Sequence, residues 1–178
     1  MSIVYTIGHS TRAIEEFIQI LQSCKIETVA DVRTIATSRH NPQYNKDDLR
    51  HSLSREDIGY IHLKGLGGLR HTTKVSVNTA WGNVSFRGYA DYMQTTQFKE
   101  NLDLLVHILK DKPTAIMCAE ALPWRCHRSL IGDALLIMNI TVIDIINEKN
   151  TKTHLMTSFA KVEGQRIIYP KDSLTGGL

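Results

Sequence analysis

The sequence lacks the features that mark membrane, secreted and nucleic-acid-binding proteins. Among its 178 residues no apolar run approaches the roughly 20 that a membrane helix needs, so we expect no membrane partner. Three cysteines are too few for a secreted disulfide scaffold, which favours reduced thiols. Residues 1–6 lack the basic flank and long apolar core of a signal peptide, and we expect a cytoplasmic protein. The net charge of +3 gives only weak support for nucleic acid as a partner.

Several cofactor and catalytic motifs are also missing. There is no glycine-rich dinucleotide fingerprint and no P-loop lysine motif, so the sequence identifies no cofactor. Ser10 and Ser129 lack the context of a nucleophile elbow. Repeats, linkers and low-complexity segments are absent, and the length suits one domain, which we expect to span residues 1–178.

What is present is an alternation of strand and helix patterns. Short apolar runs predict about five buried strands, at residues 3–7, 26–31, 58–63, 114–118 and 140–146. Helical spacing predicts four helices. The candidate N-caps of the first three are Ser10 or Thr11, Asn45, and Thr95 or Thr96. The fourth helix begins after Cys126 and is expected to bury apolar residues as far as Met138. This order predicts an α/β fold, a three-layer α/β/α sandwich on a mostly parallel, Rossmann-like sheet.

Two segments give weaker patterns. Residues 64–87 are irregular and hold several glycines, and a loop of that length inside a compact domain is usually functional or mobile. Residues 147–178 form a C-terminal appendage in which only 166–169 has the pattern of a strand.

The densest group of reactive side chains is segment 118–129, which follows a predicted strand and leads into a helix. It holds two thiols, a carboxylate, an imidazole and two guanidiniums. Ligands of α/β sheets bind at such turns, and a helix start favours anions and lowers thiol pKa values. The candidate catalytic residues are Cys118, Glu120, Cys126 and His127.

Other polar turns are expected to meet this segment, because the carboxyl ends of parallel strands lie at one edge of a sheet. The candidate ligand-binding residues are His9, Ser10, Asp31, Arg33, Gly67, Gly68, Arg70 and Arg128. If the first and fourth strands are neighbours, His9 approaches Cys118. At about 100° per residue, His127 points toward the sheet edge, Arg128 flanks that face and Ser129 points away.

Each candidate also has a purely structural interpretation. Cys118 is either a nucleophilic or redox thiol or a small buried hydrophobic residue, and Cys126 is a low-pKa thiol, a partner of Cys118 or a tolerated neighbour of the helix start. Glu120 is a general acid or base, or a solvated loop carboxylate. His9 is a base, a metal ligand or a helix cap.

The arginines allow two interpretations as well. Arg33, Arg70 and Arg128 suit a planar anion such as phosphate or carboxylate. Alternatively they pair structurally with Asp31 or Glu120. Glycines such as Gly67 and Gly68 also serve ordinary tight turns, and Cys24 ends an amphipathic helix, where a structural role is expected.

Two known site types compare poorly with segment 118–129. The cysteine-phosphatase loop places five residues between thiolate and arginine, whereas six separate Cys118 from Arg125. A zinc site from Cys118, Cys126, His127 and His9 has suitable ligand types, but its spacing matches no standard structural zinc motif. The sequence therefore predicts no metal.

The set of motifs at 6–10, 31–33, 66–70, 88–93 and 118–129 resembles the domain-of-unknown-function 488 family over nearly the whole chain. The resemblance implies a bacterial or archaeal cytosolic α/β domain without an established activity, although some relatives carry DNA-repair labels. Ile35 stands where relatives tend to have proline, which affects the path of that loop.

Two functions from different classes follow. The first is an enzyme acting on a small anionic substrate, a nucleotide or other phosphate-bearing molecule. Here Cys118 is nucleophile or redox thiol, Glu120 and His127 transfer protons, and the arginines bind the anion. The alternative is a non-catalytic module that senses a nucleotide or docks on nucleic acid, in which the thiols do not matter.

Overall fold

The five apolar runs form neighbouring strands of a single sheet, to which a sixth strand adds. The computed structural model describes residues 2–171. The sheet consists of β1 (Ile3–Gly8), β2 (Thr28–Asp31), β3 (Gly59–His62), β4 (Thr114–Cys118), β5 (Thr141–Asn147) and β6 (Asn150–Thr153). Its order is β3-β2-β4-β1-β5-β6, and only β6 runs antiparallel to its neighbour. The α/β fold class is confirmed, with six strands rather than about five.

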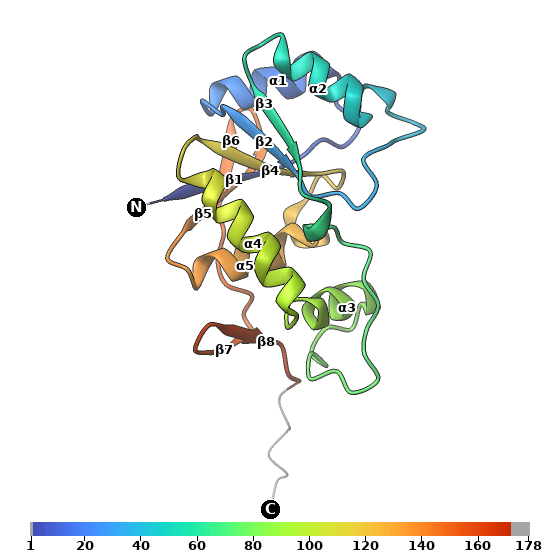
Figure 1. Ribbon diagram of the computed structural model, residues 1–178, viewed down its shortest axis with the longest axis vertical. Coiled ribbons are helices and arrows are strands. Elements are labelled where there is room, and N and C mark those ends of the chain that lie inside the picture. The colour runs from blue at the N-terminus through green and yellow to red at the C-terminus, as the bar shows by residue number, and fades with distance from the viewer. Residues whose placement is uncertain (1, 172–178) are drawn as a thin grey trace, which may run out of the picture.

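Helices cover both faces of this sheet (Figure 1). α1 (Ile14–Ser23) and α2 (Lys46–Ser54) pack on one face, around the buried strand residues Val29 and Met117. α3 (Val84–Tyr92), α4 (Thr96–Leu109) and α5 (Arg128–Leu136) belong to the opposite core, around Val4 and Ile116. Short strands that are buried on both faces read as continuous apolar runs, which is why the sequence located them.

Several predicted boundaries are wrong. The first helix begins at Ile14 with Ala13 as its N-cap, and neither Ser10 nor Thr11 caps it. Ser10 has φ 51° and its amide bonds to the carbonyl of Ala119 at 2.9 Å, so this turn joins the sheet edge instead. Met138, which we expected in the last helix and core, lies beyond the end of α5 and is 39% exposed.

The irregular stretch 64–87 contains more structure than expected. A 3-10 turn spans Lys64–Leu66, and α3 begins at Val84, where the Asn83 side chain accepts from two amides of the first turn. Asp91 of α3 anchors the loop before it, by accepting from the Ser76 hydroxyl at 2.6 Å and the Asn78 amide group at 2.7 Å.

The C-terminal segment also has more strands than expected. The predicted strand at 166–169 is confirmed as β8 (Arg166–Ile168), which pairs with the unpredicted β7 (Lys161–Glu163). Two further 3-10 turns, Pro42–Tyr44 and Pro123–Arg125, lie near the carboxyl edge of the sheet. Within residues 2–171, no helix has the length and apolar character needed to cross a membrane.

Candidate functional site

The candidate site lies where β1 and β4 end side by side. Gly8 is the register partner of Cys118, and the His9 amide donates to the Cys118 carbonyl at 2.9 Å. This confirms that adjacent first and fourth strands bring His9 to Cys118. From β1 the chain crosses to β2, on one side of the β4–β1 pair, and from β4 it crosses to β5, on the other side. The two connections run over opposite faces of the sheet. Ligands of open α/β sheets bind at such switch points.

A cavity of about 680 Å³ opens at this edge. It brings together eight of the twelve candidate residues, namely His9, Ser10, Arg33, Gly68, Cys118, Glu120, Cys126 and His127. The other four candidates do not line it, namely Asp31, Gly67, Arg70 and Arg128. The strand ends therefore bring most of the candidates to the cavity, whereas the charged side chains of Asp31, Arg70 and Arg128 do not line it.

The floor of the cavity is a cluster of two thiols and an imidazole. One side-chain donor atom from each of Cys118, Cys126 and His127 lies within 4.8 Å of the others. Both thiols are buried, with exposed fractions of 9% for Cys118 and 5% for Cys126. Cys126 stands just before α5, where the unpaired amides and the helix dipole favour a negative charge.

The positive charge nearest to this cluster is the buried guanidinium of Arg128, which is 1% exposed. Its Nε donates to Cys126 Sγ at 3.4 Å, its Nη1 donates to Thr6 Oγ1 at 3.4 Å, and its Nη2 donates to the Glu120 carbonyl. Among the described residues, no carboxylate lies within ion-pair distance of Arg128. Because a buried charge needs a counter-charge, the thiolate of Cys126 is the natural partner.

The two thiols are placed to share one proton. The sulfurs of Cys118 and Cys126 lie within 4.8 Å of each other, and this contact, together with His127 and Arg128, lowers the pKa of Cys126. The same contact, together with burial, raises the pKa of Cys118, which keeps its proton. The negative charge of the pair therefore resides on Cys126.

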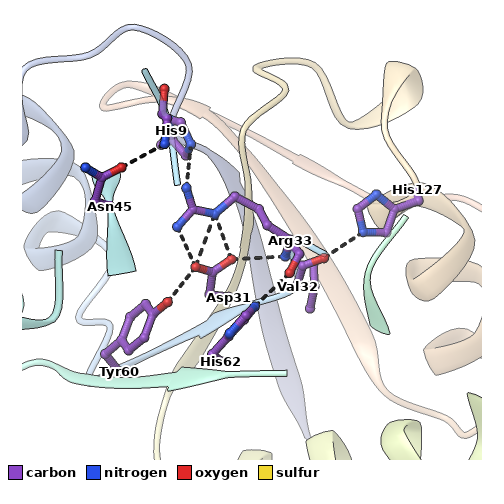
Figure 2. Close-up of polar contacts among 9 residues, drawn as sticks. His9, Asp31, Val32, Arg33, Asn45, Tyr60, His62 and His127 are labelled. Carbon is purple, nitrogen blue, oxygen red and sulfur yellow. Dashed lines mark hydrogen bonds and ion pairs between the residues drawn. The ribbon is translucent and has the colours of Figure 1, made fainter. Parts of the chain in front are cut away.

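His127 is oriented by the end of β2. Its Nε2 lies 3.0 Å from the Val32 carbonyl, and since a carbonyl only accepts, this nitrogen carries the proton (Figure 2). Its Nδ1 faces Cys126 Sγ at 3.6 Å, where it donates to the thiolate when protonated and offers a lone pair when not. Gly68 makes room for the ring, because a Cβ at that position would lie 2.5 Å from Nδ1. The predicted orientation of His127 toward the sheet edge is confirmed.

A second polar group, centred on Asp31 and Arg33, lies at the end of β2 (Figure 2). Arg33 forms a bidentate ion pair with Asp31, with Nη2 2.6 Å from Oδ2, and its Nη1 lies 3.4 Å from His9 Nε2. His9 donates from Nδ1 to the Ser10 carbonyl at 2.8 Å and stacks on Tyr44. Burial, assisted by the charge of Arg33, lowers the pKa of His9 to about 4, so His9 is neutral with both nitrogens engaged.

The remaining candidates have structural partners. Arg70 donates to the carbonyls of Gly65 and Gly67 and covers the ring of Tyr92. The exposed Glu120 accepts from the Leu122 amide at 3.2 Å. Ser129, which we expected to point away from the site, is buried and donates to the Cys126 carbonyl at 2.9 Å.

Sequence reasoning overlooked one cation of the cavity. Arg125 is exposed and lines the cavity, and no side-chain partner of its guanidinium is found among residues 2–171. The comparison with the phosphatase loop drew attention to this residue, but its spacing from Cys118 set it aside. Arg125 is the cavity arginine that is free to meet an anion, since Arg33 is neutralised by Asp31.

The family model described as Domain of unknown function DUF488 matches residues 13–135. The chain belongs to this family. The matched segment includes the ends of β2 and β4 and the whole Cys118–Cys126–His127 cluster. The predicted family is confirmed over these residues, and the motif at 6–10 lies outside them. No curated protein and no solved structure matches the chain significantly.

Proposed function

We propose that this protein is an enzyme that acts on a small anionic substrate, with the Cys126 thiolate as its reactive group. One observation carries the proposal. Among the residues that the structure describes, Cys126 Sγ is the only partner of the buried Arg128 that is capable of negative charge, and this sulfur lines an open cavity. A thiolate held by an arginine and a helix start is a prepared nucleophile.

The roles of the other residues follow from their positions. Arg125 meets the anionic part of the substrate at the cavity wall, and His127 Nδ1 lies beside the sulfur. The charge distribution favours Cys126 as nucleophile and makes Cys118 the nearest proton donor, which reverses the order favoured by the sequence. As Cys126 Sγ bonds to an electrophilic centre, the leaving group departs and the Cys118 thiol supplies its proton.

Site-resolved alkylation tests this proposal. Metal-free protein is treated with iodoacetamide at pH 7, and modification of Cys24, Cys118 and Cys126 is followed by peptide mass spectrometry. The expected result is that Cys126 reacts fastest, even though Cys24 is more exposed. Equally slow reaction at Cys118 and Cys126 would instead support the non-catalytic binding module, in which the thiols have no chemical role.

A further inference from the structure

The same three side chains have the composition and arrangement of a metal site. We propose that Cys118 Sγ, Cys126 Sγ and His127 Nδ1 bind a thiophilic divalent cation of the zinc type, with its fourth coordination position open to the cavity. The consequence for the thiolate rests on the proposed function: an ion bound here occupies the sulfur that would otherwise react, so that metal occupancy switches the site off.

The donor set and its spacing support this assignment. Zinc binds sulfur at about 2.3 Å and imidazole nitrogen at about 2.0–2.1 Å, which places tetrahedral donors roughly 3.5–4 Å apart. The three donor atoms here lie within 4.8 Å of one another, so small side-chain movements close them on an ion. Two thiolates and one imidazole, with one position left for water or substrate, also form a known type of catalytic zinc site.

The imidazole is already oriented as a ligand. Metal-bound histidines commonly donate their second ring nitrogen to a backbone carbonyl, which fixes the tautomer and aims the lone pair. His127 makes this contact to Val32, which leaves Nδ1, beside Cys126, as the nitrogen that can bind an ion. Gly68 packs over the face of the ring at Nδ1, and both residues line the cavity, so a larger side chain there would push the ring away from the sulfurs.

The surroundings fit a bound cation in charge and in ligand number. Two thiolates neutralise a divalent ion, and the Arg128 hydrogen bond to Cys126 Sγ is a typical contact of a metal-bound thiolate with its outer shell. His9 does not supply a fourth ligand, because its nitrogens lie against Ser10 and Arg33. The metal-ligand cluster found within residues 2–171 therefore has three members, and its open side is the cavity.

Cobalt substitution tests the site directly. The full chain is freed of metal by chelation and titrated with Co²⁺, whose bonds to thiolate give charge-transfer absorption. We expect one ion per chain, a sulfur-to-cobalt band and displacement by Zn²⁺. Cys118→Ser, Cys126→Ser and His127→Gln should each weaken binding at least tenfold, whereas Cys24→Ser, outside the cluster, should leave it unchanged.

A glycine pair separates loss of the site from loss of the fold. Gly68→Ala keeps all three ligands but places a Cβ 2.5 Å from His127 Nδ1, so Co²⁺ affinity should fall roughly 10–100-fold. In the matched control, Gly82→Ala, the new Cβ meets nothing within 4 Å, and wild-type affinity is expected. Circular dichroism of every variant confirms that the chain remains folded.

The outcomes distinguish this inference from the proposed function. Co²⁺ bound without a sulfur band, or with equal affinity in folded Cys118→Ser and Cys126→Ser chains, would overturn the metal site. If the site exists, Zn²⁺ protects Cys126 from iodoacetamide and a chelator restores its reaction. An unreactive Cys126 in metal-free protein, together with normal Co²⁺ binding, would leave the metal site standing and refute the thiolate enzyme.

Discussion

The guanidinium of Arg128 lies against the sulfur of Cys126, with Nε 3.4 Å from Sγ, at the start of α5. Arg128 is among the largest fully buried side chains of the described residues. Since burying an unpaired charge costs several kcal/mol, this contact ties the stability of the fold to the ionisation of the site. By its burial alone Cys126 resembles an ordinary core residue, and the contact with Arg128 makes it the negatively charged group of the cavity.

Removing the buried guanidinium of Arg128 should therefore lower the reactivity of the Cys126 thiol. In Arg128→Met, the thiolate of Cys126 loses its counter-charge, and we expect alkylation of Cys126 by iodoacetamide at pH 7 to slow by roughly tenfold or more, since a rise of one unit in thiol pKa costs about tenfold in thiolate. Rates are measured by mass spectrometry on metal-free protein. Arg125→Met serves as the control, because its guanidinium does not contact Cys126. Unchanged rates in Arg128→Met would refute the assignment of the charge.

The role of Arg125 is tested with a charged reagent. Iodoacetate and iodoacetamide attack the same sulfur, but only iodoacetate is an anion. In Arg125→Gln the rate with iodoacetate should fall several-fold, while the rate with iodoacetamide changes little, because a rim cation attracts anions without altering a neutral encounter. Raising the salt concentration should reduce the wild-type preference in the same direction. Equal effects on both reagents would contradict an anion-binding role.

The sequence predicted the parts of this site that depend on strand ends. Cys118, His9 and Arg33 each follow an apolar run, and a parallel sheet gathers such positions at one edge. What escaped prediction depends on contacts distant in sequence. Periodicity placed Arg128 beside the apolar face of its helix, but its burial requires Thr6 of β1 and the carbonyl of Glu120 as partners.

Other failures arose where local patterns are weak. β6 (Asn150–Thr153) is exposed at all four residues, so it carries no apolar alternation and forms because it pairs with β5. Residues 84–87, the start of α3, fall in the stretch predicted to be irregular, and no helix is predicted over 88–92, because glycine and polar residues obscure the helical spacing. Backbone pairing and capping, rather than hydrophobic pattern, determine these two elements.

The ion pair of Asp31 and Arg33 supports the wall of the cavity and makes a stability prediction. Asp31 is fully buried and also accepts from the Tyr60 hydroxyl at 2.6 Å. In Asp31→Asn the buried guanidinium loses its counter-charge, and the free energy of unfolding in urea should fall by about 3–5 kcal/mol. The exposed Asp111→Asn should change it by no more than about 0.5 kcal/mol. A loss below about 1 kcal/mol at Asp31 would show that the pair is dispensable.

Asp91 should control the loop that precedes α3. Its Oδ2 accepts from the Thr73 amide and the Thr72 hydroxyl, each at 2.8 Å, while Oδ1 holds Ser76 and Asn78. These hydrogen bonds lower the pKa of Asp91 although its burial opposes this. Asp91→Asn replaces an acceptor by a donor and should loosen the loop, so that trypsin cleaves after the exposed Lys74 faster than in wild type. Cleavage after the exposed Lys149, in the turn between β5 and β6, is the internal control and should not change.

His154 gives the protein a pH-dependent stability. Its Nε2 lies 3.0 Å from Asp133 and its Nδ1 3.4 Å from Asp144. Burial opposes the charge of His154, but the two carboxylates outweigh it and raise the pKa to about 9. Tyr169 donates to Asp133 at 2.8 Å, and burial raises its pKa above the ordinary value, so this hydroxyl remains protonated around pH 9.

The sign of the effect follows from the unfolded chain, in which a histidine has a pKa of about 6.5. Because the folded state holds the proton more tightly, the contribution of His154 is complete below pH 6.5 and declines as the pH rises through 9. Its full size is on the order of 3 kcal/mol. Urea unfolding of wild type and His154→Gln, compared from pH 6 to pH 10, should show a difference that shrinks across this interval. A difference that stays constant would mean that His154 is uncharged in the folded protein.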